Sequence, residues 1–163
     1  MFPILFVLAA SAAPACPAKP APLPAELAGW PMAKALKAAS SGEAAAQAPL
    51  TLGQSADLTL VLERVMSFAA SPGRAKDDPS FGGLASIRID KAGTYRVTLD
   101  SPAWIDLVAG GAALKSTGHS HGTDCSGIGK MVDFRLEPGT YLVQLAGSVP
   151  DKVRVLVTAV PGA

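Results

Sequence analysis

The sequence is poor in charge and in aromatic side chains. Of its 163 residues only 17% are charged and 6% are aromatic, and 14 Lys and Arg against 13 Asp and Glu leave a formal net charge of +1. Surfaces that bind nucleic acid need clustered basic side chains, often with aromatic residues for stacking. Here the basic residues are scattered along the chain. We therefore expect no nucleic-acid partner.

Long apolar runs and the common catalytic signatures are also missing. No stretch approaches the roughly 20 apolar residues that a membrane-spanning helix needs, so we expect no transmembrane segment. The sequence has no G-x-S-x-G nucleophile elbow, no P-loop and no dinucleotide-binding fingerprint. Its glycines stand instead where turns are expected.

The chain begins with a short apolar run followed by small residues. Residues 1–15 are predicted to be a signal peptide, with cleavage near Ala13 or Ala15, although no Lys or Arg precedes the apolar run. This predicts a periplasmic or secreted protein. Residues 16–163 remain after cleavage, which is the size of one ordinary domain with a real core.

The sequence has only two cysteines, Cys16 and Cys125. In an exported protein two cysteines favour one disulfide bond, Cys16–Cys125. The alternative is two free thiols. The choice bears on function, because a free Cys125 thiolate would be a good metal ligand and a disulfide sulfur would not.

Residues 16–49 form a Pro/Ala-rich arm. Prolines between Pro17 and Pro24 favour an extended, polyproline-like segment. Residues 32–39 could form two helical turns, ended by Ser40-Ser41-Gly42. Trp30 is expected to pack on the domain and anchor the arm.

Residues 50–163 alternate apolar and polar side chains with a period of two. Turn residues separate the alternating segments, and almost no helix is expected. This pattern predicts an all-β fold, an antiparallel β-sandwich of the jelly-roll kind. The expected strands cover residues 57–63, 83–90, 94–99, 104–108, 112–114, 131–136, 140–145 and 153–157.

A weak internal repeat supports this fold. The segments 92–99 and 138–145 share a turn glycine, a Thr-Tyr pair and an alternating strand. A tyrosine just after a turn often buries its ring and bonds a nearby loop with its hydroxyl. We therefore interpret Tyr95 and Tyr141 as structural residues.

The strongest candidate for chemistry is the pair His119-Ser-His121, which contains every imidazole of the chain. In extended backbone, residues i and i+2 point to the same side, so both rings could face one metal ion. Imidazole with sulfur suits copper or zinc, and imidazole with carboxylate suits zinc, iron or copper. The candidate further ligands are Cys125, Asp124, Met131, Asp106 and Asp133. The alternative is an exposed polar loop that binds nothing specific.

Two resemblances extend this interpretation. The segments Cys16–Trp30, His119–Ile128 and Lys130–Phe134 resemble small exported bacterial proteins, some of which are described as homogentisate 1,2-dioxygenases. That description would imply Fe(II) held by His119 and His121, with Asp124 or Asp106 as the carboxylate ligand. Residues 136–157 resemble the closing hairpin of the pre-peptidase C-terminal type of secreted β-sandwich, which implies an accessory or binding role.

Taken together, these features predict an exported, periplasmic binding or accessory protein that is not an enzyme, with an iron dioxygenase as the alternative. Copper or zinc at His119 and His121 is the first choice of ligand. A periplasmic protein or a glycan are the other partners considered, and a purely structural interaction module is the remaining alternative.

Overall fold

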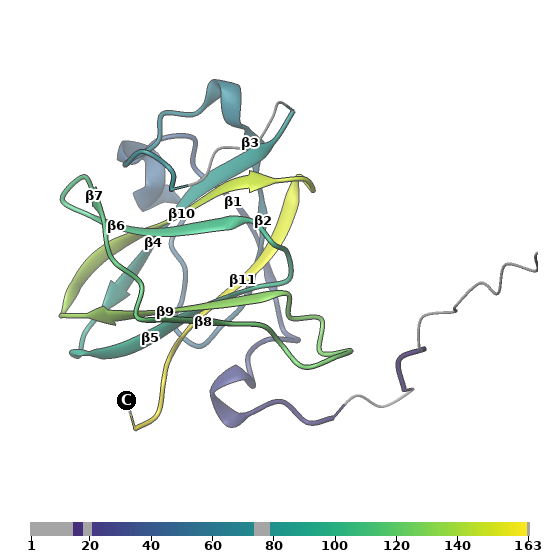
Figure 1. Ribbon diagram of the computed structural model, residues 1–163. Helices are drawn as coiled ribbons and strands as arrows, with labels where there is room; N and C mark the ends of the chain where they lie inside the picture. The colour runs from purple at the N-terminus through teal and green to yellow at the C-terminus, as the bar shows by residue number, and fades with distance from the viewer. Residues whose placement is uncertain (1–14, 18–20, 74–78, 163) are drawn as a thin grey trace, which may run out of the picture.

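The computed structural model describes residues 15–17, 21–73 and 79–162, and shows two β-sheets packed face to face (Figure 1). The first sheet contains, in spatial order, β1 (Lys34–Lys37), β2 (Ala56–Thr59), β11 (Lys152–Ala159), β5 (Gly93–Leu99), β9 (Lys130–Leu136) and β8 (Gly118–Ser120). The second contains β3 (Val61–Leu62), β4 (Phe81–Ile89), β10 (Gly139–Ser148), β6 (Trp104–Ala109) and β7 (Ala112–Ala113). The predicted all-β sandwich is confirmed. The predicted leader lies outside the described residues, except for Ala15.

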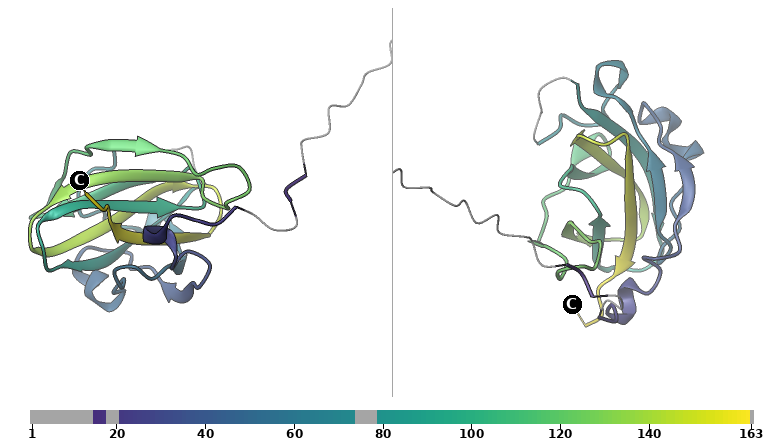
Figure 2. Two further views of the ribbon diagram at one scale, coloured as in Figure 1. Left: turned by 90° about the horizontal axis from the view of Figure 1, so that it is seen from below. Right: turned by 90° about the vertical axis from the view of Figure 1, so that its right-hand side faces the viewer.

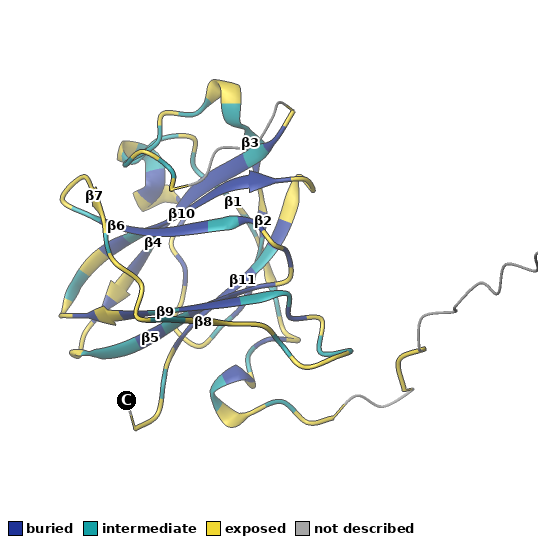
Figure 3. Cartoon of the chain, viewed as in Figure 1, coloured by how far each residue is buried: buried dark blue, intermediate teal, exposed yellow. Residues whose placement is uncertain are grey.

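The core lies between the two sheets, as the dark strands of Figure 3 show. It is built from every second side chain of the strands, the ones that point inward. In β5 these are Tyr95, Val97 and Leu99. The hydroxyl of Tyr95 donates to the Lys91 carbonyl at 2.8 Å, and that of Tyr141 donates to the Glu137 carbonyl at 2.8 Å. Both tyrosines are therefore structural, as the repeat predicts.

The predicted helix over residues 32–39 is wrong. Residues 34–37 of this segment form β1, which pairs in parallel with β2 at the edge of the first sheet. The Lys34 N–H donates to the Ser55 carbonyl at 3.0 Å, and the Ala38 N–H donates to the Thr59 carbonyl at 3.0 Å. A helix of two turns is marginal in water, so strand pairing prevails. The described helical segments are short 3-10 turns, η1 (Ala25–Leu27), η2 (Glu43–Gln47) and η3 (Glu63–Val65).

The predicted strand over residues 57–63 is divided between the sheets. Its first part is β2 of the first sheet and its second part is β3 of the second sheet. Leu60 lies between them, buried, with its N–H bonded to the Asp151 carbonyl at 2.7 Å. The alternating pattern continues into this crossing, because Leu58 of β2 and Leu60 both belong to the core between the sheets.

The part of the arm before β1 packs on the outer face of the first sheet. Leu27 and Trp30 are buried there against Ile128, Met131 and Leu156. Figure 2 shows this purple segment lying beside the sandwich rather than between its sheets. Trp30 therefore anchors the arm, as expected. No helix in the described part of the chain is long and apolar enough to cross a membrane.

Two ion pairs join neighbouring strands on that same outer face. Arg96 of β5 binds Asp133 of β9 through two N–H···O contacts of 2.7 and 2.9 Å. Arg154 of β11 binds Asp57 of β2 at 2.8 and 3.1 Å. The Arg154 guanidinium, which bonds to the Asp57 carboxylate, lowers the pKa of Asp57 below its usual value.

Candidate functional site

His119 lies on a strand rather than in a loop. It is the central residue of β8, which pairs antiparallel with β9 at the edge of the first sheet. His119 stands directly opposite Val132, whose side chain belongs to the core between the sheets. Directly opposed residues share one face of a sheet, so the exposed imidazole of His119 is on the side that faces the second sheet.

A hollow of about 260 Å³ opens at this edge, between the two sheets. Its lining comes from β6 of the second sheet, from β8 and β9 of the first, and from the connection between β7 and β8. The lining residues are Trp104, Ile105, Ser116, His119, Lys130 and Val132.

Trp104 is held in place by a polar network on the outer face of the second sheet. Its indole N–H donates to the Asp106 carboxylate at 2.9 Å. Gln144, which is fully buried, donates to the other oxygen of Asp106 at 3.4 Å and accepts from the Ala69 N–H at 2.8 Å. Asp106 is thus committed to positioning Trp104, on the opposite face of its sheet from the core.

His121 follows β8 and is fixed through one ring nitrogen. Its Nδ1 lies 2.8 Å from the Gly129 carbonyl oxygen. A carbonyl can only accept, so Nδ1 donates and the neutral ring presents the lone pair of Nε2. Gly129 is itself held, because its N–H donates to the Leu99 carbonyl at 2.8 Å.

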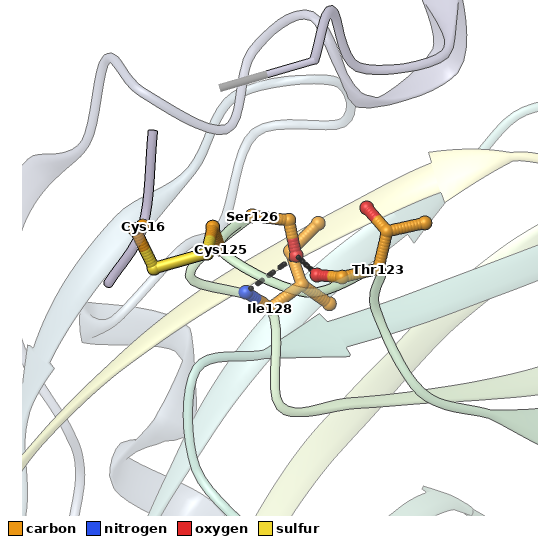
Figure 4. The surroundings of a disulfide bond; sticks show 5 residues. All are labelled: Cys16, Thr123, Cys125, Ser126 and Ile128. Atoms are coloured by element: carbon orange, nitrogen blue, oxygen red, sulfur yellow. Dashed lines mark hydrogen bonds between the residues drawn. A yellow bond between two sulfur atoms is a disulfide. The ribbon is translucent and has the colours of Figure 1, made fainter. Parts of the chain in front are cut away.

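The loop between His121 and Gly129 is tied to the arm by the predicted disulfide. Cys125 is bonded to Cys16, with their Cα atoms 5.5 Å apart (Figure 4). Inside the loop the Ser126 hydroxyl donates to the Thr123 carbonyl at 2.6 Å and accepts from the Ile128 N–H at 3.2 Å. The disulfide prediction is confirmed, and the alternative of a Cys125 thiolate ligand is wrong.

The remaining candidate ligands are not gathered around the histidines. Met131 stands opposite Ser120 and is buried with the arm on the outer face, away from the side that His119 faces. Asp133 is paired with Arg96, and Asp124 is exposed. Over residues 15–17, 21–73 and 79–162, no three His, Cys, Asp or Glu side chains form a group that could hold a metal ion.

The sequence analysis identifies His119 but not its neighbours in the hollow. Trp104 and Ile105 belong to the strand predicted over residues 104–108, and the sequence gives them no role in a site. Alternation does show that Lys130 and Val132 share a face. It does not show that the strand carrying Trp104 lies across the gap between the sheets.

Comparison with known proteins identifies no relative: no family model matches the chain, and no curated protein matches it significantly.

Proposed function

We propose that this chain is an exported binding or accessory protein whose ligand site is the β8 edge at His119 and His121. The Cys16–Cys125 disulfide supports export, because such bonds persist in oxidising compartments such as the periplasm. The position of His119 at the mouth of a hollow supports a binding role.

The first ligand we propose is copper or zinc, bound by the two imidazoles. The observation that carries this proposal is the contact between His121 Nδ1 and the Gly129 carbonyl. Metal-binding histidines commonly donate their second ring N–H to a carbonyl, which fixes the ring and directs the other nitrogen to the metal. Because the chain would supply two ligands, the remaining positions would be filled by water or by a partner molecule.

Calorimetric titration of chelator-treated protein with Cu(II), and separately with Zn(II), tests this proposal. We expect one ion per chain, and at least about a tenfold loss of affinity in both His119→Ala and His121→Ala. Ser120→Ala is the matched control, because Ser120 lies between the two histidines and is exposed. Unchanged binding in the double histidine variant would contradict the proposal.

The same preparation tests the dioxygenase alternative. A ring-cleaving iron enzyme needs a carboxylate beside its two histidines, and Asp106 is instead bonded to Trp104 and Gln144. We expect no oxygen uptake when Fe(II)-loaded protein is mixed with homogentisate. Uptake that depends on His119 and His121 would establish the enzyme instead.

A further inference from the structure

Strand β1 has an edge that carries no partner strand in the described part of the chain. It is the end strand of the first sheet, and the N–H groups of Lys34 and Ala38 donate toward β2, each at 3.0 Å. Backbone groups of alternate residues point to the same edge of a strand. Leu36 therefore also bonds toward β2, and the N–H and carbonyl groups of Ala35 and Lys37 point away from it. These groups can pair with a further strand.

A second segment of the chain lies across from this edge and is fixed to the other sheet. The Leu50 N–H donates to the Ser86 carbonyl of β4 at 2.8 Å, and the Ser86 N–H donates to the Ala48 carbonyl at 3.0 Å. Ala39, which follows β1, exchanges two hydrogen bonds with Leu84 of β4, at 2.8 and 2.9 Å. The space beside β1 therefore has two walls, each held by backbone bonds to a different sheet.

Two hollows lie between these walls, one after the other along β1. The first, of about 140 Å³, lies beside residues 34–36 and across from residues 49–51. The second, of about 380 Å³, lies beside residues 37–39 and across from residues 47–48. We call them the β1 hollows. They leave open space where the side chains of a strand added to β1 would otherwise meet packed atoms.

The two β1 hollows are chemically alike. Each is lined by one lysine, one glutamine and a hydroxyl residue: Lys34, Gln54 and Thr51 in the first, and Lys37, Gln47 and Ser40 in the second. None of the lining residues in the described part of the chain is acidic. Both lysines are exposed, and neither forms an ion pair with a residue that the structure describes. The edge therefore favours carboxylate side chains, which accept hydrogen bonds from all three kinds of group.

The two lysines also decide which strand fits this edge. A second copy would bring the same lysines to it, and like charges across a pair of strands destabilise the pair. Asp or Glu opposite each lysine would instead stabilise it. Lys34 and Lys37 are three positions apart, and no two acidic residues of this chain are three positions apart in the sequence. The strand that fits therefore belongs to another protein.

We infer that the free edge of β1 binds an extended segment of another protein, with Asp or Glu residues three positions apart that lie opposite Lys34 and Lys37. The segment adds to the sheet as a strand. Its backbone pairs with Ala35 and Lys37, which supplies affinity, and its two carboxylates supply specificity. β1 and β8 are the two end strands of the first sheet. The site thus lies at the other edge from His119 and does not depend on the proposed metal function.

Titration with matched peptides in the presence of chelator tests this inference, followed by NMR of the backbone amides. The probe is acetylated and amidated Thr-Glu-Thr-Thr-Glu-Thr. Thr-Gln-Thr-Thr-Gln-Thr removes its charges, and Thr-Thr-Glu-Glu-Thr-Thr keeps them at a different spacing. We expect the probe to bind at least about tenfold more tightly than the Gln peptide and about threefold more tightly than the respaced peptide.

The amides of Ala35 and Lys37 should shift and become protected from hydrogen exchange when the probe binds, because they gain hydrogen bonds. Equal affinities for the Glu and Gln peptides would overturn the inference. Protection confined to other parts of the chain would overturn it as well. Protection of these two amides that rises with protein concentration before any peptide is added would show that a second copy occupies the edge, and would also overturn it.

Variants of the lysines provide the second part of the test. We expect Lys34→Gln and Lys37→Gln each to weaken probe binding at least about threefold, because each removes one cation from the edge. Lys91→Gln removes the same charge from an exposed residue outside both β1 hollows, and should change affinity less than about twofold. Equal weakening by all three substitutions would show a general charge effect and overturn the assignment.

Ala35→Pro tests the backbone pairing. It removes the N–H that points to the free edge and no bond to β2, and proline is tolerated at such positions of edge strands. We expect at least about a tenfold loss of probe affinity. Thermal melts identify any loss of folding, and a probe methylated at its backbone nitrogens tests the same pairing without changing the protein. Full affinity of the folded Ala35→Pro variant, or of the methylated probe, would overturn strand addition.

Discussion

Cys16 and Cys125 are separated by 109 residues in the sequence, and their bond joins the arm to the loop that follows β8. A cross-link over so long a span removes much conformational entropy from the unfolded chain. The same loop contains His121 at its start and ends at Gly129, the residue that fixes the ring of His121.

Loss of this disulfide should destabilise the protein. We expect the paired Cys16→Ser and Cys125→Ser variant to lose about 2–4 kcal/mol of unfolding free energy. Urea denaturation of the oxidised protein, the reduced protein and the double variant provides the measurement. The reduced protein and the variant should agree with each other, and a midpoint equal to that of the oxidised protein would contradict the expectation.

The ion pair between Asp57 and Arg154 makes a pH-dependent contribution to the stability of the folded protein. Arg154 lowers the pKa of Asp57 below its ordinary value of 3.8, so the folded protein favours the charged carboxylate. The stability that the pair adds is fully present above the pKa that Asp57 has in the unfolded chain. It is lost as the pH falls through the lower pKa that Asp57 has in the folded protein. We expect Asp57→Asn to cost about 1 kcal/mol at pH 7, because the pair is partly exposed.

Urea denaturation of the wild type and of Asp57→Asn at pH 7 and at pH 3 measures this effect. The difference between the two proteins should shrink at the lower pH. Arg88→Gln is a suitable control, since Arg88 forms an exposed pair with Asp90 and its removal should matter little at either pH. A difference for Asp57→Asn that stays constant between pH 7 and pH 3 would argue against the assignment.

Gln144 should be among the polar residues whose substitution destabilises the protein most. Its amide accepts from the Ala69 N–H and donates to the Ala70 carbonyl at 3.0 Å, in a fully buried position. Replacement by Leu removes the partner of these partly buried backbone groups, and a group left unsatisfied costs at most about 1–3 kcal/mol. Chemical denaturation measures the loss, and Gln144→Glu tests whether restoring one acceptor recovers part of it. A Leu variant as stable as the wild type would show that water replaces the amide.

The hydroxyls of Tyr95 and Tyr141 should contribute similar amounts to the free energy of unfolding. Each donates to the carbonyl four residues earlier, Tyr95 to Lys91 and Tyr141 to Glu137, and Tyr141 also accepts from the Glu137 N–H at 3.2 Å. We expect each Tyr→Phe change to cost about 1 kcal/mol, with the larger loss at Tyr141. Thermal denaturation of the two single variants makes the comparison. A larger effect at Tyr95 would show that the additional bond of Tyr141 is not decisive.

The sequence predicts the sandwich well because alternation reports burial directly. Tyr95, Val97 and Leu99 all face the core, as their spacing requires. The disulfide follows from the presence of only two cysteines. Alternation cannot show which sheet a strand joins, so the change of sheet at Leu60 is not visible. Helical propensity over residues 32–39 also fails, because pairing with β2 outweighs it.

The site is predicted less completely, because its residues meet only after the two sheets pack. His119 is conspicuous as one of two histidines, and Cys125 as one of two cysteines. Their spacing does not show that Cys125 faces Cys16 or that Met131 lies on the opposite side of the sheet from His119. Ile105 lines the hollow at a part of β6 that lies beyond its pairing with β7. The pattern of apolar and polar residues does not show where that pairing ends.

The bond at Cys16 has a practical consequence for work on the mature protein. If the leader is removed after Ala15, Cys16 becomes the first residue and its amino group is tethered to the body of the domain. A fluorescent label or surface attachment at the amino terminus would then report on the loop around Cys125 instead of a loose tail. An aminopeptidase that cuts after Cys16 would leave that residue attached through sulfur, so the trimmed protein would gain the mass of one water molecule and would lose the cysteine only on reduction.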